Sequence, residues 1–275
     1  MRHRPPASAR RWWMVACALA AIALSVALGI GSSTRAAVPL RAALPSTITI
    51  LADQDRHPPP PPPPTSPQDL HVGEGLAWAH PPMFRGLART PVTVFLHGAC
   101  GDPAPGCALL SKAATTRGWL LCPTGPRRCG RAWDWSGSGA DKRAHLEASI
   151  ANLTDRWPGH VGREGHVLVG FSRGAFAARD ILYAGARFRG VIFIGAAFIP
   201  DPEKLRARGV RRVVLACGDH DGARPTMVKA TAVLLRAGVQ ARFMSMGPTW
   251  HQLPADSSDR LAESLAWVSE PPPAT

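Results

Sequence analysis

The chain has 275 residues, of which 45% are hydrophobic, and it contains 28 prolines and 26 glycines. This length suits one α/β domain with additional N-terminal material better than two small domains, and so much Pro and Gly requires loops or a linker. The net charge of +13 comes from arginines spread along the whole sequence. Because no nucleic-acid-binding motif accompanies this charge, we expect no nucleic-acid partner and interpret it as a solvated basic surface.

Residues 1–36 have the features of an export leader. Four arginines lie within the first eleven residues, an uncharged apolar run follows at 12–30, and small residues lead to Ala36. This order is typical of a secretory signal peptide cleaved near Ala36, although the apolar run is also long enough to remain as a membrane anchor. In either case we expect the remainder of the chain outside the cytoplasm, whether secreted, periplasmic or tethered to the membrane.

A proline-rich linker is predicted for residues 37–70. Its unbroken proline run at 58–64 favours a stiff polyproline helix, which cannot pair with a sheet, and residues 47–51 form a candidate short strand. The composition therefore predicts a spacer. We place one folded domain at 71–275.

Four of the six cysteines lie in Gly- and Pro-rich segments that we expect to be loops: Cys100, Cys107, Cys122 and Cys129. Without a Cys-x-x-Cys spacing a zinc site is the weaker interpretation, and export would supply the oxidising compartment that disulfides need. Three pairings of four cysteines exist, and pairing the neighbours in sequence would close two small loops. In a strand-like run, Cys217 is expected as a buried free thiol.

Apolar strand patterns alternate with helical patterns from residue 92 onward. The predicted strands are 92–96, 119–122, 166–169, 191–194, 210–217 and 240–246, and the predicted helices are 141–157, 173–184, 226–237 and 256–268. Residues 123–139 are expected to form a long loop. This alternation predicts a mostly parallel, doubly wound α/β sheet with right-handed crossovers.

A Gly-x-Ser-x-Gly motif spans residues 170–174, between a predicted strand and a predicted helix. The pentapeptide by itself is common, but a strand before it and a helix after it are typical of a nucleophile elbow with Ser172 at its apex. The backbone N–H of Arg173 would then lie at a helix start, where it favours a developing oxyanion. Ser172 is therefore the candidate nucleophile.

A second motif follows the strand 92–96, which ends in His97-Gly98. A glycine in this loop allows the backbone to approach a substrate carbonyl, so we expect the N–H of Ala99, or of the neighbouring Cys100, to be the other oxyanion donor. The alternative is that His97-Gly98 only ends the strand.

In the long loop, Trp133 and Trp135 are candidates for substrate binding, because aromatic faces bind apolar or sugar rings; the alternative is that they cover an edge of the core.

An acid and a base follow the elbow in the order that a serine nucleophile needs. Gly218 to Asp221 follow one predicted strand and His251 follows the next, at carboxyl ends where an open sheet places its ligands. Asp219 is an alternative acid, and His220 and His97 are alternative bases. A histidine would take the serine proton, and an aspartate would orient the histidine.

From Val92 to Val268 the chain resembles the α/β-hydrolase superfamily, on His97-Gly98, Gly170 to Gly174, Gly218-x-x-Asp221 and His251. Within it, the chain is most similar to secreted esterases of the polyhydroxybutyrate depolymerase or feruloyl esterase type. The resemblance implies the catalytic triad Ser172, Asp221 and His251, with Asp221 preferred because the family's acid occupies that position.

The resemblance further implies a serine hydrolase that cleaves a small-molecule or polymeric carboxylic ester through an acyl-enzyme, with no cofactor and no metal. The alternatives are a serine peptidase or amidase, and a noncatalytic extracellular binding module on the same fold.

Overall fold

An eight-stranded sheet forms the centre of the protein. The computed structural model describes residues 62–84 and 89–270. The strands of this sheet are β1 (Gln68–Val72), β2 (Gly75–His80), β3 (Val92–Leu96), β4 (Trp119–Pro123), β7 (Val167–Phe171), β8 (Gly190–Ile194), β9 (Arg212–Cys217) and β10 (Gln240–Ser245). A separate hairpin pairs β5 (Arg127–Cys129) with β6 (Ala132–Asp134).

The strand order is β1-β2-β4-β3-β7-β8-β9-β10. The pairs β1–β2 and β2–β4 are antiparallel, and every other pair in this sheet is parallel. The predicted mostly parallel, doubly wound sheet is confirmed. The central strands β3, β4 and β8 are buried along their whole length, as continuous apolar runs in a parallel sheet require.

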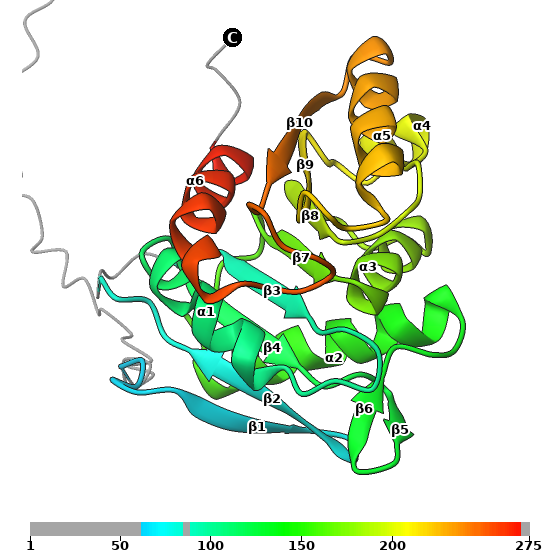
Figure 1. Ribbon diagram of the computed structural model, residues 1–275. Helices are drawn as coiled ribbons and strands as arrows, with labels where there is room; N and C mark the ends of the chain where they lie inside the picture. The colour runs from blue at the N-terminus through cyan, green and yellow to red at the C-terminus, as the bar shows by residue number, and fades with distance from the viewer. Residues whose placement is uncertain (1–61, 85–88, 271–275) are drawn as a thin grey trace, which may run out of the picture. The chain divides into compact units, whose positions relative to one another are not determined.

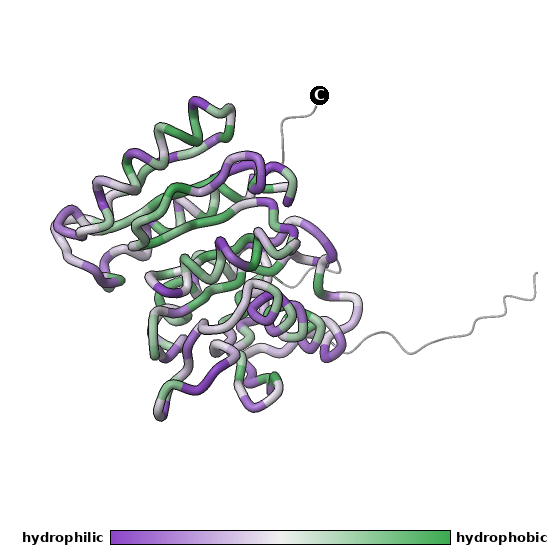
Figure 2. The backbone as a smooth tube through the Cα atoms, turned by 90° about the vertical axis from the view of Figure 1, so that its right-hand side faces the viewer, coloured by the Kyte–Doolittle hydropathy of each residue, from purple (hydrophilic) through white to green (hydrophobic). Residues whose placement is uncertain are grey.

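Helices cover both faces of the sheet (Figure 1). They are α1 (Ala104–Thr115), α2 (Gly139–Arg156), α3 (Arg173–Tyr183), α4 (Pro202–Ala207), α5 (Arg224–Arg236) and α6 (Ser258–Ser269), with a short 3₁₀ turn at Ala255–Ser257. One core lies beneath α1 and α6 and includes Leu110 and Leu261, and the other includes Ile181 and Leu234 on α3 and α5. Figure 2 shows hydrophobic residues along the strands and hydrophilic residues in the loops.

The sheet begins earlier than the sequence predicted. Strand β1 starts inside the predicted linker 37–70, and β1 and β2 together form an antiparallel edge before the strand predicted at 92–96. The predicted leader 1–36 and the candidate strand 47–51 lie outside the described residues. Among the described residues, no helix is both long enough and apolar enough to cross a membrane.

Helix α1 is absent from the predicted elements because its first turn contains Pro105 and Gly106. Proline is tolerated in the first turn of a helix, where its missing N–H has no partner to lose. Gly106 is needed for packing, since a Cβ there would lie 2.3 Å from Cε1 of Phe95. Residues 123–139 were also expected to be only a loop, but they contain the β5–β6 hairpin.

Two disulfides join these four cysteines in a nested pattern, and not in the pairs Cys100–Cys107 and Cys122–Cys129. Cys100 bonds Cys129, and Cys107 bonds Cys122. Cys107 lies on α1 and Cys122 on β4, both buried, so the expectation that all four cysteines lie in loops is wrong for these two. The position of Cys122 agrees instead with the strand predicted at 119–122. Cys217 is a buried free thiol, as predicted, and burial raises its pKa to about 11.

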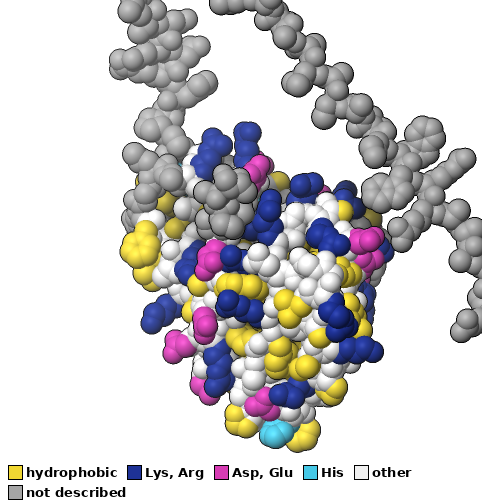
Figure 3. All heavy atoms as spheres, turned by 90° about the horizontal axis from the view of Figure 1, so that it is seen from above, with side chains coloured by type: hydrophobic (Ala, Val, Ile, Leu, Met, Phe, Trp, Pro, Cys, Tyr) yellow, Lys and Arg dark blue, Asp and Glu magenta, His cyan; other side chains and the backbone are white. Residues whose placement is uncertain are grey.

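Basic side chains are spread over the face of the protein that Figure 3 shows. Figure 3 shows Lys and Arg scattered across one face with acidic side chains among them. This distribution agrees with a solvated basic surface over that face.

Candidate active site

Ser172 stands at a sharp turn between β7 and α3. Its backbone has φ 53° and ψ −118°, a conformation that is costly for a residue with a side chain. The flanking glycines are required by close approach of the backbone. A Cβ at Gly174 would lie 2.1 Å from the carbonyl oxygen of Leu96, and a Cβ at Gly170 would lie 2.4 Å from that of Gly174. The two glycines of the motif therefore allow the sharp turn from strand to helix that the sequence predicted.

Ser172, His251 and Asp221 form a continuous chain of hydrogen-bond contacts. The loop after β10 crosses toward the start of α3 (Figure 1) and places His251 Nε2 2.8 Å from Ser172 Oγ. His251 Nδ1 lies 2.9 Å from Asp221 Oδ2. Because a carboxylate only accepts, Nδ1 carries the proton, and Nε2 is left free to accept the proton of the serine hydroxyl.

Asp221 is itself held in place. Its side chain is only 5% exposed, and its Oδ1 accepts a hydrogen bond from the N–H of Ala223 at 2.8 Å. The ring of Phe171 stacks on that of His251, with centroids 5.3 Å apart. Backbone and ring contacts thus limit the orientations of both the acid and the base.

The alternative residues point elsewhere. The carboxylate of Asp219 accepts a hydrogen bond from Ser245 Oγ at 2.7 Å and lies 3.5 Å from Arg224 Nε. His220 packs against the ring of Trp250, at a centroid distance of 5.4 Å. The structure therefore brings Ser172 together with Asp221 and His251, and not with Asp219 or His220.

His97 is buried beneath the loop after β3. Its Nε2 accepts a hydrogen bond from the N–H of Gly125 at 3.0 Å, so Nδ1 carries the proton and donates to the carbonyl of Gly98 at 2.7 Å. Burial lowers the pKa of His97, which favours this neutral form. Both ring nitrogens are occupied, so His97 links the loop to Gly125 and is not placed as a base.

The two predicted oxyanion donors lie in segments that converge on Ser172. Ala99 is exposed in the loop whose Gly98 approaches the serine, since a Cβ at Gly98 would be 3.6 Å from Ser172 Cβ. Arg173 is the first residue of α3. Among the described residues, the turn, loop and cap hydrogen bonds of the backbone include none donated by the N–H of Ala99 or the N–H of Arg173.

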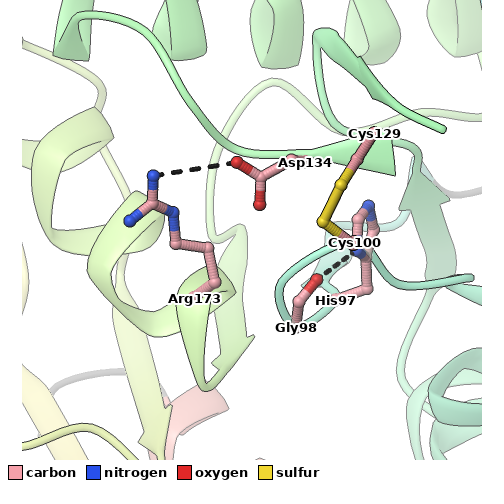
Figure 4. The surroundings of a disulfide bond; sticks show 6 residues. All are labelled: His97, Gly98, Cys100, Cys129, Asp134 and Arg173. Carbon is pink, nitrogen blue, oxygen red and sulfur yellow. Dashed lines mark hydrogen bonds and ion pairs between the residues drawn. A yellow bond between two sulfur atoms is a disulfide. The ribbon is translucent and has the colours of Figure 1, made fainter. Parts of the chain in front are cut away.

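The Cys100–Cys129 disulfide ties this loop to the β5–β6 hairpin (Figure 4). Cys100 has a positive φ of 44°, and Gly101 forms an antiparallel bridge with Trp133 on β6. From the same strand, Asp134 faces the guanidinium of Arg173 at 3.7 Å. The sequence did not predict the disulfide between the loop and the hairpin, or the contact of Asp134 with Arg173, because both depend on the hairpin.

The two tryptophans predicted to bind substrate occupy different surroundings. Trp135 is 0% exposed and lies between the rings of His97 and His145, so its predicted contact with substrate is wrong and the core alternative holds. Trp133 is partly exposed beneath the guanidinium of Arg128, at 3.9 Å, and its role stays a prediction. Next to His251, Trp250 is 70% exposed, and it was not among the predicted substrate residues.

No protein-family profile and no curated protein matches the sequence, but solved structures do. Esterase PE8 is 25% identical at a TM-score of 0.51, covering 69% of this chain and 97% of its own. A Bacillus cereus carboxylesterase is 15% identical at 0.53, covering 71% and 95%. FphF, a fluorophosphonate-binding serine hydrolase of Staphylococcus aureus, is 12% identical at 0.57, covering 76% and 100%. The chain accordingly has the α/β-hydrolase fold that these esterases and serine hydrolases share.

Proposed function

We propose that the protein is an extracytoplasmic serine hydrolase that cleaves a carboxylic ester through an acyl-enzyme on Ser172. The observation that carries the proposal is the contact chain from Ser172 Oγ through His251 to Asp221, at 2.8 Å and 2.9 Å. These are the distances at which a histidine can take a proton from a serine while a carboxylate stabilises the resulting cation.

In the proposed reaction, Ser172 Oγ attacks the ester carbonyl carbon while its proton moves to His251 Nε2. Negative charge then develops on the carbonyl oxygen, where the N–H groups of Ala99 and Arg173 would donate to it. Collapse of the intermediate expels the alcohol, which takes the proton from His251. Water repeats the sequence on the acyl-enzyme, releasing the acid and restoring the serine.

Support for a location outside the cytoplasm comes from the two disulfides, which persist in oxidising compartments. The predicted leader at residues 1–36 agrees with that setting. The cheapest check is intact mass of the exported protein before and after thiol alkylation, since four free thiols at these positions would contradict an oxidising location.

Exposed apolar side chains favour a substrate with an apolar part. Trp250 is 70% exposed beside the candidate base, and Ile199 is 41% exposed after the carboxyl end of β8. We propose that they contact the acyl or alcohol group. Initial rates across p-nitrophenyl esters of increasing chain length test this, since a Trp250→Ala variant should lose its preference for the longer esters.

Ser172→Ala tests the proposed function. The variant should lose hydrolysis of short p-nitrophenyl esters and keep the thermal unfolding transition, whereas Ser111→Ala on α1 should retain activity. Full activity in Ser172→Ala would refute the assignment. A folded wild-type protein that hydrolyses neither esters nor anilides would instead favour the noncatalytic binding module, and a preference for anilides would favour an amidase.

A further inference from the structure

A cavity lies at the amino-terminal end of the parallel strands, at the opposite end of the sheet from Ser172. It has a volume of about 430 Å³ and lies beside the amino ends of β7, β8 and β9, whereas Ser172 follows the carboxyl end of β7. Five arginines line it: Arg163, Arg187, Arg189, Arg208 and Arg211. The proposed hydrolase chemistry uses none of them.

The backbone that carries these arginines is fixed by hydrogen bonds. The N–H of Arg189 donates to the carbonyl of His166 at 2.8 Å, and the N–H of Arg211 donates to the carbonyl of Arg189 at 2.8 Å. The Arg189 guanidinium lies against the bare backbone of Gly165, where a Cβ would be 3.3 Å from its Cζ. These hydrogen bonds fix the backbone of Arg189 and Arg211 relative to each other and to the start of β7.

Among the described residues, no carboxylate forms an ion pair with the arginines of this cavity. Glu164 is the one described acidic residue that lines the cavity. The mutual repulsion of the arginines opposes folding, and a bound multivalent anion would relieve it.

His166 also lines this cavity. Its Nδ1 accepts a hydrogen bond from the N–H of Val92 at 3.0 Å, so the proton of the neutral ring lies on Nε2. Burial lowers the pKa of His166, which keeps the ring neutral near pH 7. The cavity is thus lined by planar guanidiniums and by a neutral histidine, and guanidiniums are donors suited to oxyanions.

We propose that this arginine cleft binds phosphoryl oxyanions, and that ligands with two or more phosphate groups bind best. Guanidinium groups match phosphate oxygens in bidentate pairs, and five of them exceed what one singly charged carboxylate could neutralise. None of the exposed large hydrophobic side chains of the described residues lines the cleft, which favours a soluble phosphate over a lipid surface.

The test is calorimetric titration of the full chain with pyrophosphate at constant ionic strength, because salt screens nonspecific attraction. Saturable binding is expected, and it should weaken roughly tenfold or more in Arg187→Gln/Arg211→Gln, which removes two charge-assisted contacts. The matched control is Arg117→Gln/Arg236→Gln, which removes the same charge from exposed arginines elsewhere. Its affinity should change less than about twofold.

Three results would overturn the proposal: no saturable binding by the wild type, equal losses in the two double variants, or binding to phosphatidylglycerol vesicles without binding to pyrophosphate. Chemical footprinting of the wild type covers the case of a misfolded variant. Pyrophosphate should protect Arg187 and Arg211, but not Arg117 and Arg236, from phenylglyoxal, and uniform protection would contradict the site. Ester hydrolysis should be unchanged in Arg187→Gln/Arg211→Gln, so this test is independent of the proposed function.

Discussion

Breaking the Cys100–Cys129 disulfide should impair turnover as well as stability. The bond joins positions 29 residues apart, for which loop-closure entropy gives about 3.6 kcal/mol. Cys107–Cys122 joins positions 15 apart and gives about 3.0 kcal/mol. In a domain of this size, losing either bond should lower the melting temperature by roughly 6–14 °C.

The two bonds differ in what they hold. Cys100 follows Ala99 in the loop that would supply one oxyanion donor, whereas Cys107 and Cys122 are buried between α1 and β4. Removing one such donor costs about 10²–10³-fold in kcat in other enzymes. We therefore expect Cys100→Ala/Cys129→Ala to lose about tenfold or more in kcat with KM nearly unchanged.

Steady-state kinetics on p-nitrophenyl acetate, well below both melting transitions, measure this difference. The matched control Cys107→Ala/Cys122→Ala should lose comparable stability and keep kcat within about threefold. Equal losses of kcat in the two variants, or full kcat in the first, would refute the idea that the disulfide positions the loop.

Three further outcomes are expected. Asp221→Asn should lower kcat by roughly 10²–10⁴-fold, since the amide no longer stabilises a charged His251, while Asp219→Asn should stay near wild type; the reverse order in kinetic assays would exchange the two acids. Unfolding stability, measured by urea at about pH 7.5 and about pH 5.5, should fall with acidity. The reason is that burial lowers the pKa of four histidines below the usual 6.5 of the unfolded chain: His80, His97, His145 and His166. Their contribution to stability is complete above 6.5 and is lost as the pH falls from that value through the lowered pKa of the folded state. Iodoacetamide at about pH 8 should leave Cys217 unmodified until the protein is unfolded, because the thiol is buried and its pKa is raised to about 11; rapid alkylation of the native protein, seen by peptide mass spectrometry, would contradict this.

Much of the fold could be predicted because central parallel strands are buried on both faces. Residues 191–194 form an uninterrupted apolar run, and all of β8 is buried. Strands β1 and β2 escaped prediction because only alternate residues are buried, as in Trp78 and His80 beside Ala77 and Ala79. A short alternating run is a weak signal next to a proline-rich segment.

The order of the site residues along the chain could also be predicted, but their orientation could not. Asp219 and Asp221 lie in one turn, and the N–H of Ala223 and the hydroxyl of Ser245 direct them to different partners. Nothing in the sequence around Trp135 indicates that the chain places this ring in the core directly after β6. Disulfide pairing likewise depends on α1, because this helix carries Cys107 next to Cys122 on β4. The helix itself was not predicted, because Pro105 and Gly106 lie in its first turn.

The central claim is that Ser172 is an activated nucleophile. Intact-mass and peptide analysis after treatment with a fluorophosphonate measures it most directly, because the reagent phosphonylates a serine whose proton a neighbouring base can remove. We expect one adduct on Ser172 in the wild type and none in a folded Ser172→Ala variant. A folded wild-type protein without an adduct, or with its adduct on another residue, would contradict the claim.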